Sequence, residues 1–160
     1  MALKWKKSDL MTLAEKKVQM ANETCQNLIY AGIDVQLAGG TEHFALEPND
    51  QTNIDSMFTA VTLGATQYPY HSDGAQCKMY SAVDIVTLYV AYKTFVTKQT
   101  TYCNFLKIWV NRETDKDVLA GITYGSELPS DLNAEMEEIL TAAAAEIQAI
   151  IGKMQQAMEA

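Results

Sequence analysis

Two long segments, one at each end of this chain, carry apolar residues at alternating spacings of three and four. In the first segment the apolar series is Met11, Ala14, Val18, Ala21, Cys25 and Leu28. In the second segment it is Met136, Leu140, Ala143, Ile147, Ile150, Met154 and Ala157. This spacing places a narrow apolar stripe along one side of a helix, and such a stripe must be covered by another helix. The pattern therefore predicts two long helices that need helical partners.

The residues at the ends of both segments are typical of helix termini. Ser8 and Asp9 are suitable N-caps for the first helix, and Gly32 is expected to end it. Ser130 or Asp131 is expected to begin the last helix, which continues almost to the end of the chain.

The residues between these two helices predict a compact block with both strands and helices. Alternating apolar residues around glycine-containing turns predict two β-hairpins, one over 35–46 and one over 68–80. A helix after Pro48 is expected between the hairpins, with Asn49 or Asp50 as its N-cap.

Two further helices are expected after the second hairpin. Apolar and aromatic residues at helical spacing predict a long helix over 82–112, with Ser81 as its N-cap. A short helix capped by Thr114 should follow. The fold class predicted for the whole chain is therefore α+β and mostly helical.

These expectations divide the chain into three segments. We expect an N-terminal docking helix at 1–32, a central α+β domain at 33–128 and a C-terminal helix at 129–160. A total of 160 residues, of which 48% are hydrophobic, is enough for one domain with helical extensions.

Charge and hydropathy argue against two classes of partner. The formal net charge is −8, and basic residues cluster only near the N-terminus, so nucleic-acid binding is not expected. No apolar run reaches the roughly 18–20 residues that span a bilayer, so membrane insertion is not expected either. The opening MALKWKKSDL has no apolar stretch after its basic residues, and we expect no signal peptide.

The three cysteines do not form a recognisable pattern. The number of cysteines is odd, and the spacing of Cys25, Cys77 and Cys103 matches neither a metal knuckle nor a redox pair. We expect all three to be buried, reduced thiols.

Metal binding and nucleophilic catalysis are the first chemical alternatives. His43, His71, Cys77 and Cys103 include the residue types that bind zinc, but only His71 and Cys77 are close in sequence, on opposite arms of one hairpin. Cys103 or Cys77 with His71 includes the residue types of a nucleophile and base, but no flanking motif supports this role. We therefore expect no metal and no cofactor.

Carbohydrate chemistry is the other alternative. Glu42 and Asp84 are the acids nearest to aromatic stretches, and a glycosidase-like pair would need one of them in an apolar pocket. Both have simpler roles in a strand and a helix cap. Aromatic residues at regular spacing are more often part of a core than of a sugar-binding groove. The residues that could line such a groove are Tyr68, Tyr70, Tyr80, Tyr89, Tyr92, Tyr102 and Trp109. No catalytic residues are expected.

Several short pieces of the central block occur in a characteristic order. They are 40–46 (GTEHFAL), 50–54 (DQTNI), 70–74 (YHSDG) with Cys77, 80–82 (YSA), 100–104 (TTYCN) and 122–125 (ITYG). In sequence and order these pieces resemble a family of uncharacterised proteins encoded in the tail modules of phages and prophages of Gram-positive bacteria. The resemblance implies a virion protein near the baseplate or the site where fibres attach, with no known enzyme activity.

The apolar stripes and one tryptophan that is expected to be exposed are the candidate interface. An apolar stripe of this length can pack within its own chain, form a homo-oligomeric coiled coil or bind a neighbouring protein. The expected interface residues are Trp5, Met11, Ala14, Val18, Ala21, Cys25, Leu28, Leu140, Ala143, Ile147, Ile150 and Met154.

Together these features predict a structural adaptor of a phage or phage-derived tail. It is expected to be assembled in the host cytoplasm, to be located in the virion tail, to form homo-oligomers and to bind other tail, baseplate or fibre proteins. The alternatives are a tail-fibre assembly chaperone that is absent from the mature particle and an enzyme that acts on the cell envelope.

Overall fold

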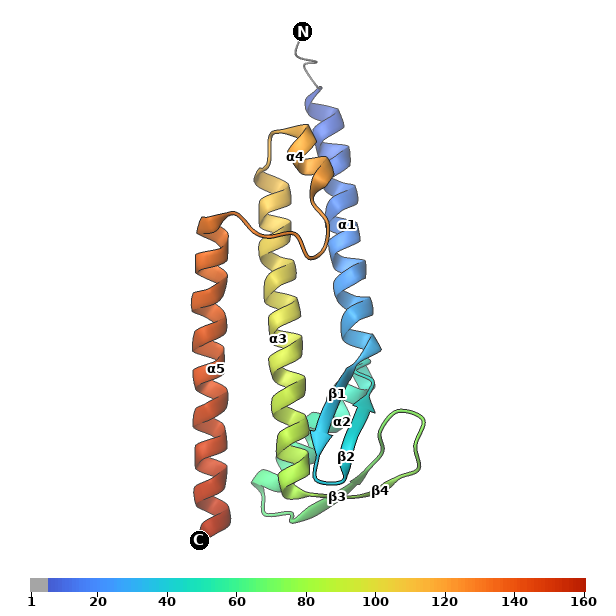
Figure 1. Ribbon diagram of the computed structural model, residues 1–160, viewed down its shortest axis with the longest axis vertical. Coiled ribbons are helices and arrows are strands. Elements are labelled where there is room, and N and C mark those ends of the chain that lie inside the picture. The colour runs from blue at the N-terminus through green and yellow to red at the C-terminus, as the bar shows by residue number, and fades with distance from the viewer. Residues whose placement is uncertain (1–5) are drawn as a thin grey trace. The chain divides into compact units, whose positions relative to one another are not determined.

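The computed structural model describes residues 6–160, and in this part of the chain it has five helices and two antiparallel pairs of strands (Figure 1). The predicted class is confirmed, since 69% of the described residues are helical and the strands form two small sheets. The elements are α1 (Lys7–Ala31), β1 (Ile33–Leu37), β2 (Gly40–Phe44), α2 (Pro48–Thr62), β3 (Gln67–Tyr70), β4 (Lys78–Ser81), α3 (Ala82–Arg112), α4 (Lys116–Gly121) and α5 (Ser130–Glu159). Trp5, an expected interface residue, lies outside the described residues.

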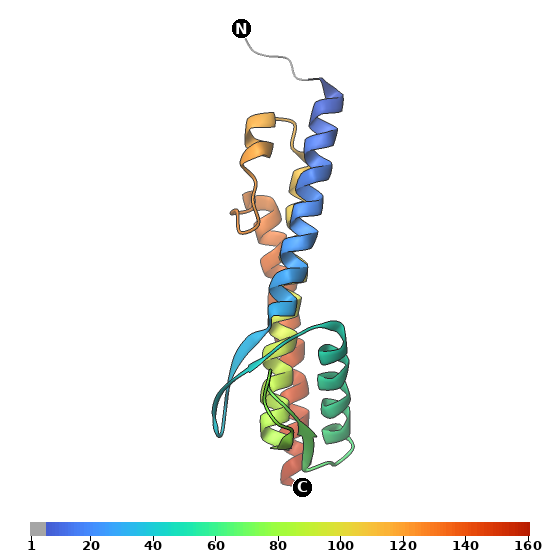
Figure 2. The ribbon, with the colours of Figure 1, turned by 90° about the vertical axis from the view of Figure 1, so that its right-hand side faces the viewer.

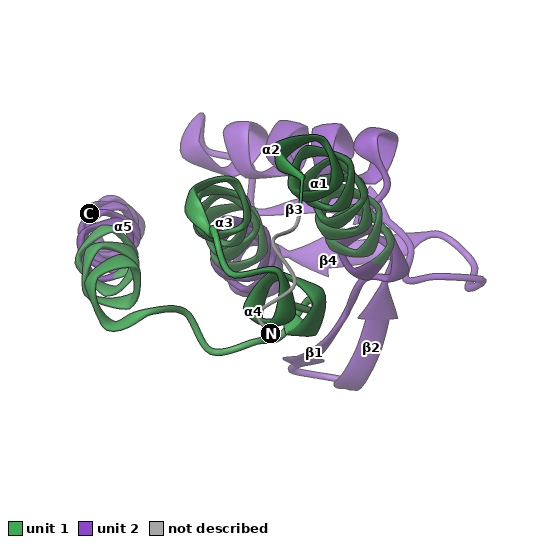
Figure 3. Ribbon diagram, turned by 90° about the horizontal axis from the view of Figure 1, so that it is seen from above, with its two compact units in different colours: residues 1–27, 98–140 green, residues 28–97, 141–160 purple. Residues whose placement is uncertain are grey.

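The contacts of the chain form two compact units, coloured separately in Figure 3. Unit 1 contains residues 98–140 with the described part of 1–27, and unit 2 contains 28–97 with 141–160. The three long helices each contribute to both units. The contacts therefore divide the chain within α1, α3 and α5, whereas the segments expected from the sequence meet between elements.

The predicted first hairpin is confirmed, and one glycine connects it to α1. Strands β1 and β2 pair with Ile33 opposite Phe44. Gly32 lies between α1 and β1 with φ +86°, and a Cβ atom placed there would lie 2.0 Å from the backbone oxygen of Phe44. No other residue fits at this position, because both the dihedral angle and the contact with the backbone exclude a side chain.

Helix α2 begins slightly earlier than the sequence suggested. Its N-cap is Glu47 and Pro48 is its first residue, so Asn49 and Asp50 lie within the first turn instead of capping it. Proline is favoured here because its missing N–H has no helical acceptor in the first turn. The Asp50 carboxylate accepts a hydrogen bond from Glu47 N at 3.0 Å and so stabilises the same helix end.

Aromatic rings pack the two hairpins of unit 2 against each other. The Phe44 ring of β2 stacks on the ring of Tyr70 and meets the ring of Tyr80 edge-on, with centroids 6.3 and 6.1 Å away. All three side chains are buried. Within this unit, α2 and the β1–β2 hairpin lie on different sides of the first half of α3 (Figure 2).

Helix α3 follows β4 directly and begins as predicted. Ser81 Oγ accepts a hydrogen bond from Asp84 N at 3.2 Å. Asp84 Oδ1 in turn accepts one from Ala38 N at 3.1 Å, in the turn between β1 and β2. A helix N-terminus favours a carboxylate at this place, so Asp84 stabilises the helix while it holds the hairpin turn.

In unit 1, α4 is capped by a different residue from the one expected. Asp115, not Thr114, is the N-cap, and its carboxylate accepts hydrogen bonds from the backbone of Asp117 at 2.9 Å and Val118 at 3.2 Å. At the other end of α4, Lys17 Nζ of α1 donates to carbonyl oxygens at 2.8 and 2.7 Å. An ammonium group is favoured at this carboxyl-terminal end, where carbonyl groups lack partners.

Candidate interaction surface

The apolar stripe of α1 is only partly available to a partner. Ala21 and Cys25 are buried within the chain, so they cannot form the interface that was expected of them. The cause is the contact between α1 and α3 in unit 1, where the Cys103 thiol of α3 donates to the Ala21 carbonyl at 3.5 Å. Met11 and Leu28, toward the two ends of the stripe, remain exposed, while Ala14 and Val18 are half-buried.

The apolar stripe of α5 is covered at single positions and open at others. Met154 is 9% exposed, so this expected interface residue is also covered by its own chain. Ile150 is exposed, and Leu140, Ala143 and Ile147 are half-buried. A stripe that is incompletely covered along a long helix retains apolar area for a second contact.

Two apolar hollows flank the last turns of α5 in unit 2. Their volumes are about 650 and 730 Å³, and Val83, Met154 and Met158 line both. The first hollow is completed by Val61, Thr62, Gly64, Ala65, Thr66, Ser81, Ala82, Ile150, Lys153 and Ala157. The second is completed by Val86, Thr87, Val90, Ala91, Ile151, Gln155 and Glu159. We call the lining of the two hollows the α5 surface.

The composition of the α5 surface suits contact with apolar side chains of a partner protein. Its charged members are Lys153 in the first hollow and Glu159 in the second. An apolar centre with few charges is typical of protein–protein contacts. Val83 is 62% exposed on α3, although it is not among the predicted interface residues. The position of Val83 in the sequence could have indicated this exposure. Ala82 and Ile85 belong to the buried side of α3, and Val83 does not have the helical spacing of that side.

Glu42 is held as an anion between the two hairpins of unit 2. Its carboxylate accepts hydrogen bonds from Lys78 Nζ at 3.0 Å and from the Tyr80 hydroxyl at 2.9 Å. Burial raises the pKa of Glu42, but these hydrogen bonds outweigh burial and the net pKa is lowered. A general acid of a glycosidase needs a raised pKa, so this environment suits a structural carboxylate instead.

The possible metal ligands do not gather at one place. His43 contacts Asp34 and the end of α1, and His71 Nδ1 lies 3.1 Å from the Ser72 carbonyl. Cys77 is exposed, which contradicts the expected burial, whereas Cys25 and Cys103 are buried as expected. Residues 6–160 contain no group of three or more His, Cys, Asp or Glu residues that could hold a metal ion.

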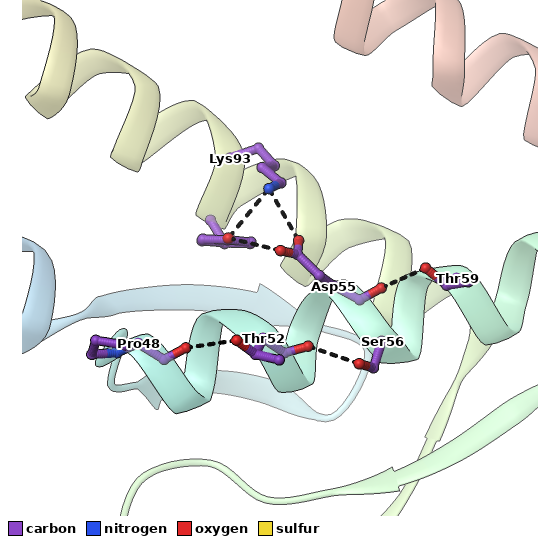
Figure 4. Close-up of polar contacts among 7 residues, drawn as sticks. Pro48, Thr52, Asp55, Ser56, Thr59 and Lys93 are labelled. Atoms are coloured by element: carbon purple, nitrogen blue, oxygen red, sulfur yellow. Dashed lines mark hydrogen bonds and ion pairs between the residues drawn. The ribbon is translucent and has the colours of Figure 1, made fainter.

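A second polar cluster joins α2 to α3 in unit 2 (Figure 4). Lys93 Nζ lies 3.0 Å from Asp55 Oδ1, and the Tyr92 hydroxyl donates to Asp55 Oδ2 at 3.3 Å. Burial lowers the pKa of Lys93, but the contacts with Asp55 and Tyr92 outweigh it and the net pKa is raised. Lys93 also lies over the rings of Tyr89 and Tyr92, with Tyr89 stacked on Phe58 at 3.6 Å. These tyrosines therefore take part in packing.

The outer side of α2 uses its hydroxyl groups locally. Thr52, Ser56 and Thr59 each donate to the backbone carbonyl four residues earlier, at 3.0, 2.9 and 2.9 Å (Figure 4). The hydroxyl protons of this side are therefore used within α2, although the oxygen atoms can still accept hydrogen bonds.

Comparison with known proteins yields a family match. The sequence model of a family described as "Domain of unknown function (DUF4376)" matches residues 12–123. This range begins within α1, includes both hairpins with α2, α3 and α4, and ends before α5. Neither a curated protein nor a solved structure matches the chain. In the described helices, no segment is long and apolar enough to cross a membrane.

Proposed function

The chain belongs to the DUF4376 family, and from this premise we propose that it is a non-enzymatic structural subunit of a phage tail or phage-derived particle. It acts as an adaptor near the baseplate or the site of fibre attachment. The α5 surface and the exposed parts of the α1 stripe bind other copies of this chain or neighbouring tail proteins.

The observation that supports the proposal most is the exposed apolar area on long helices. Met11 on α1 and Met158 on α5 are both more than half exposed, and Met158 adjoins two apolar hollows. Such area is costly to leave in water, and in soluble proteins it commonly marks sites of association. In an assembly with many linked copies, each contact can be weak because neighbouring sites raise the effective concentration.

The short segments that resemble the phage tail-module family, which we call the phage-like pieces, support a structural role in a second way. Glu42 binds Tyr80 between the hairpins of unit 2, and the Tyr102 hydroxyl accepts a hydrogen bond from Gly125 N in unit 1. In both examples one phage-like piece contacts another within its own unit. These side chains therefore hold the fold together, and the proposed tail location rests on the resemblance of the pieces that contain them.

The proposal is tested by asking whether the protein is part of the finished particle. Particles of the phage or induced prophage that carries this gene are purified on a density gradient, and each fraction is probed with an antibody against the chain. We expect the protein to co-purify with intact tails. A protein required for fibre assembly but missing from the particles would instead be an assembly chaperone.

A control separates the structural role from an enzymatic one. Purified protein and a His71→Ala variant are incubated with peptidoglycan, and soluble fragments are measured. We expect no release by either protein. Turnover by the unmodified chain that is lost in the variant would contradict the proposal and indicate an envelope-degrading enzyme.

A further inference from the structure

Two cysteines face each other where α1 and α3 meet in unit 1. The Cys25 thiol donates to the Gln99 carbonyl at 3.6 Å, and the Cys103 thiol donates to the Ala21 carbonyl at 3.5 Å. Gln99 is four residues before Cys103, and Ala21 is four residues before Cys25. Each thiol therefore binds the helical turn that precedes the other cysteine, and this reciprocal pattern places the two sulfur atoms opposite each other.

The surrounding residues allow the two helices to approach closely. Ala21 is completely buried in the contact, and its small side chain leaves room for the opposite helix. Lys107 Nζ of α3 contacts Asn22 Oδ1 of α1 at 3.0 Å, so positions later in α3 meet positions earlier in α1. The helices are therefore antiparallel here. The Cys25 side chain also contributes to the raised pKa of the Cys103 thiol, which fits two neighbouring thiols.

We propose that Cys25 and Cys103 are a modification site, a buried dithiol that a small-molecule disulfide converts into an intramolecular disulfide bond joining α1 to α3. One thiolate attacks a sulfur of the small disulfide, and a small thiol leaves. The other cysteine then attacks the mixed disulfide, and the second small thiol leaves. Two electrons pass from the cysteines to the oxidant, and the two cysteine protons end on the two small thiols that leave. This inference does not depend on the proposed function.

The environment favours a slow structural bond over rapid redox catalysis. Cys25 and Cys103 are 6% and 5% exposed. Burial and the neighbouring Cys25 raise the pKa of Cys103 to about 11. Few molecules therefore carry the reactive thiolate at neutral pH. The Tyr124 hydroxyl also binds the Gln99 carbonyl at 3.3 Å and lies beside the pair. Burial is also expected to protect the disulfide bond from reduction once it has formed.

The test measures whether the folded structure favours the bond. The full chain with Cys77→Ser, which removes the exposed thiol, is equilibrated with mixtures of reduced and oxidised glutathione, with and without denaturant. Alkylation and intact mass then give the fraction that has lost two hydrogen atoms, and peptide mapping identifies the linked cysteines. We expect the effective concentration of the two thiols to be at least roughly tenfold higher in the folded chain than in denaturant.

Controls make each outcome decisive. The variants Cys77→Ser/Cys25→Ser and Cys77→Ser/Cys103→Ser should form no intramolecular bond, and circular dichroism of the oxidised protein should match that of the reduced protein. An effective concentration in the folded chain equal to or below that in denaturant would overturn the proposal, because the native geometry would then oppose the bond. Loss of the helical signal on oxidation would overturn it as well.

Discussion

The His43 ring lies between two oxygen atoms that can only accept hydrogen bonds. Nδ1 is 2.7 Å from Asp34 Oδ1, and Nε2 is 2.7 Å from the carbonyl of Ala31, the last residue of α1. Both nitrogens need a proton to make these contacts, so the geometry fits the imidazolium form. The hydrogen bonds to Asp34 and Ala31 raise the pKa of His43, partial burial opposes this, and the charge of Asp73 adds to the rise.

The raised pKa predicts how stability depends on pH. The folded state holds the His43 proton more tightly than the unfolded state, so the stabilisation is complete below the unfolded pKa of about 6.5. It is lost as pH rises through the folded pKa. We expect the urea midpoint of the native chain to fall in this window, and His43→Gln to remove that fall. The variant His71→Gln is the control. An unchanged pH profile in His43→Gln would contradict the assignment.

At the scale of single elements, the helix caps are the features that the sequence specifies least sharply. Both Thr114 and Asp115 are good N-cap residues, and they are adjacent. The structure selects Asp115, because Thr114 N and Asp115 N are held by the Glu113 carboxylate and the helix then begins at Lys116. Because α4 begins at Lys116, Leu119 lies at a position of the helix that is completely buried.

Two neighbouring substitutions test the cap. Asp115→Ala should lower the free energy of unfolding by about 1 kcal/mol, because two backbone N–H groups of α4 lose their acceptor. Thr114→Ala should have a clearly smaller effect. Urea denaturation followed by circular dichroism measures both. Equal losses in the two variants, or a greater loss in Thr114→Ala, would show that the helix begins elsewhere.

At the scale of the whole molecule, three methionines of nearly equal exposure lie in different settings. Met11 on α1, Met79 on β4 and Met158 on α5 are 56%, 53% and 54% exposed. Only the first and last belong to the surfaces proposed to bind partners. They therefore allow a comparison in which the residue type and the exposed fraction are held constant while the location differs.

This comparison predicts which surfaces drive self-association. We expect the full chain to be an oligomer in solution, and Met158→Glu or Met11→Glu to lower its mass, because a buried carboxylate would lack a partner at the interface. Met79→Glu should leave the mass unchanged. Light scattering after size-exclusion chromatography gives the masses. A monomeric native chain, or an equal effect of all three substitutions, would remove the support for self-association through these surfaces.

Much of the fold was predictable because its signals are local. Helical spacing and terminal residues located α1, α3 and α5 to within a residue or two, and glycine turns between alternating strands located both hairpins. The candidate site was predicted less well. Ala21 and Cys25 have the same spacing as Met11, yet they are covered, and Val83 is exposed although it lies on the central helix. Spacing along a helix defines a stripe, but the neighbour that covers each part of the stripe comes from distant residues.

By itself, the sequence determined the type, order and approximate length of the elements, since these follow from backbone preferences and apolar periodicity within a few turns. It also indicated that Gly32 ends the first helix. Only the tertiary structure decided that Cys25 faces Cys103, that Met154 is covered while Met158 is open, and that Cys77 is exposed. The physical reason is that burial is a property of contacts between segments far apart in the chain, and no local pattern specifies which side of a helix meets which neighbour.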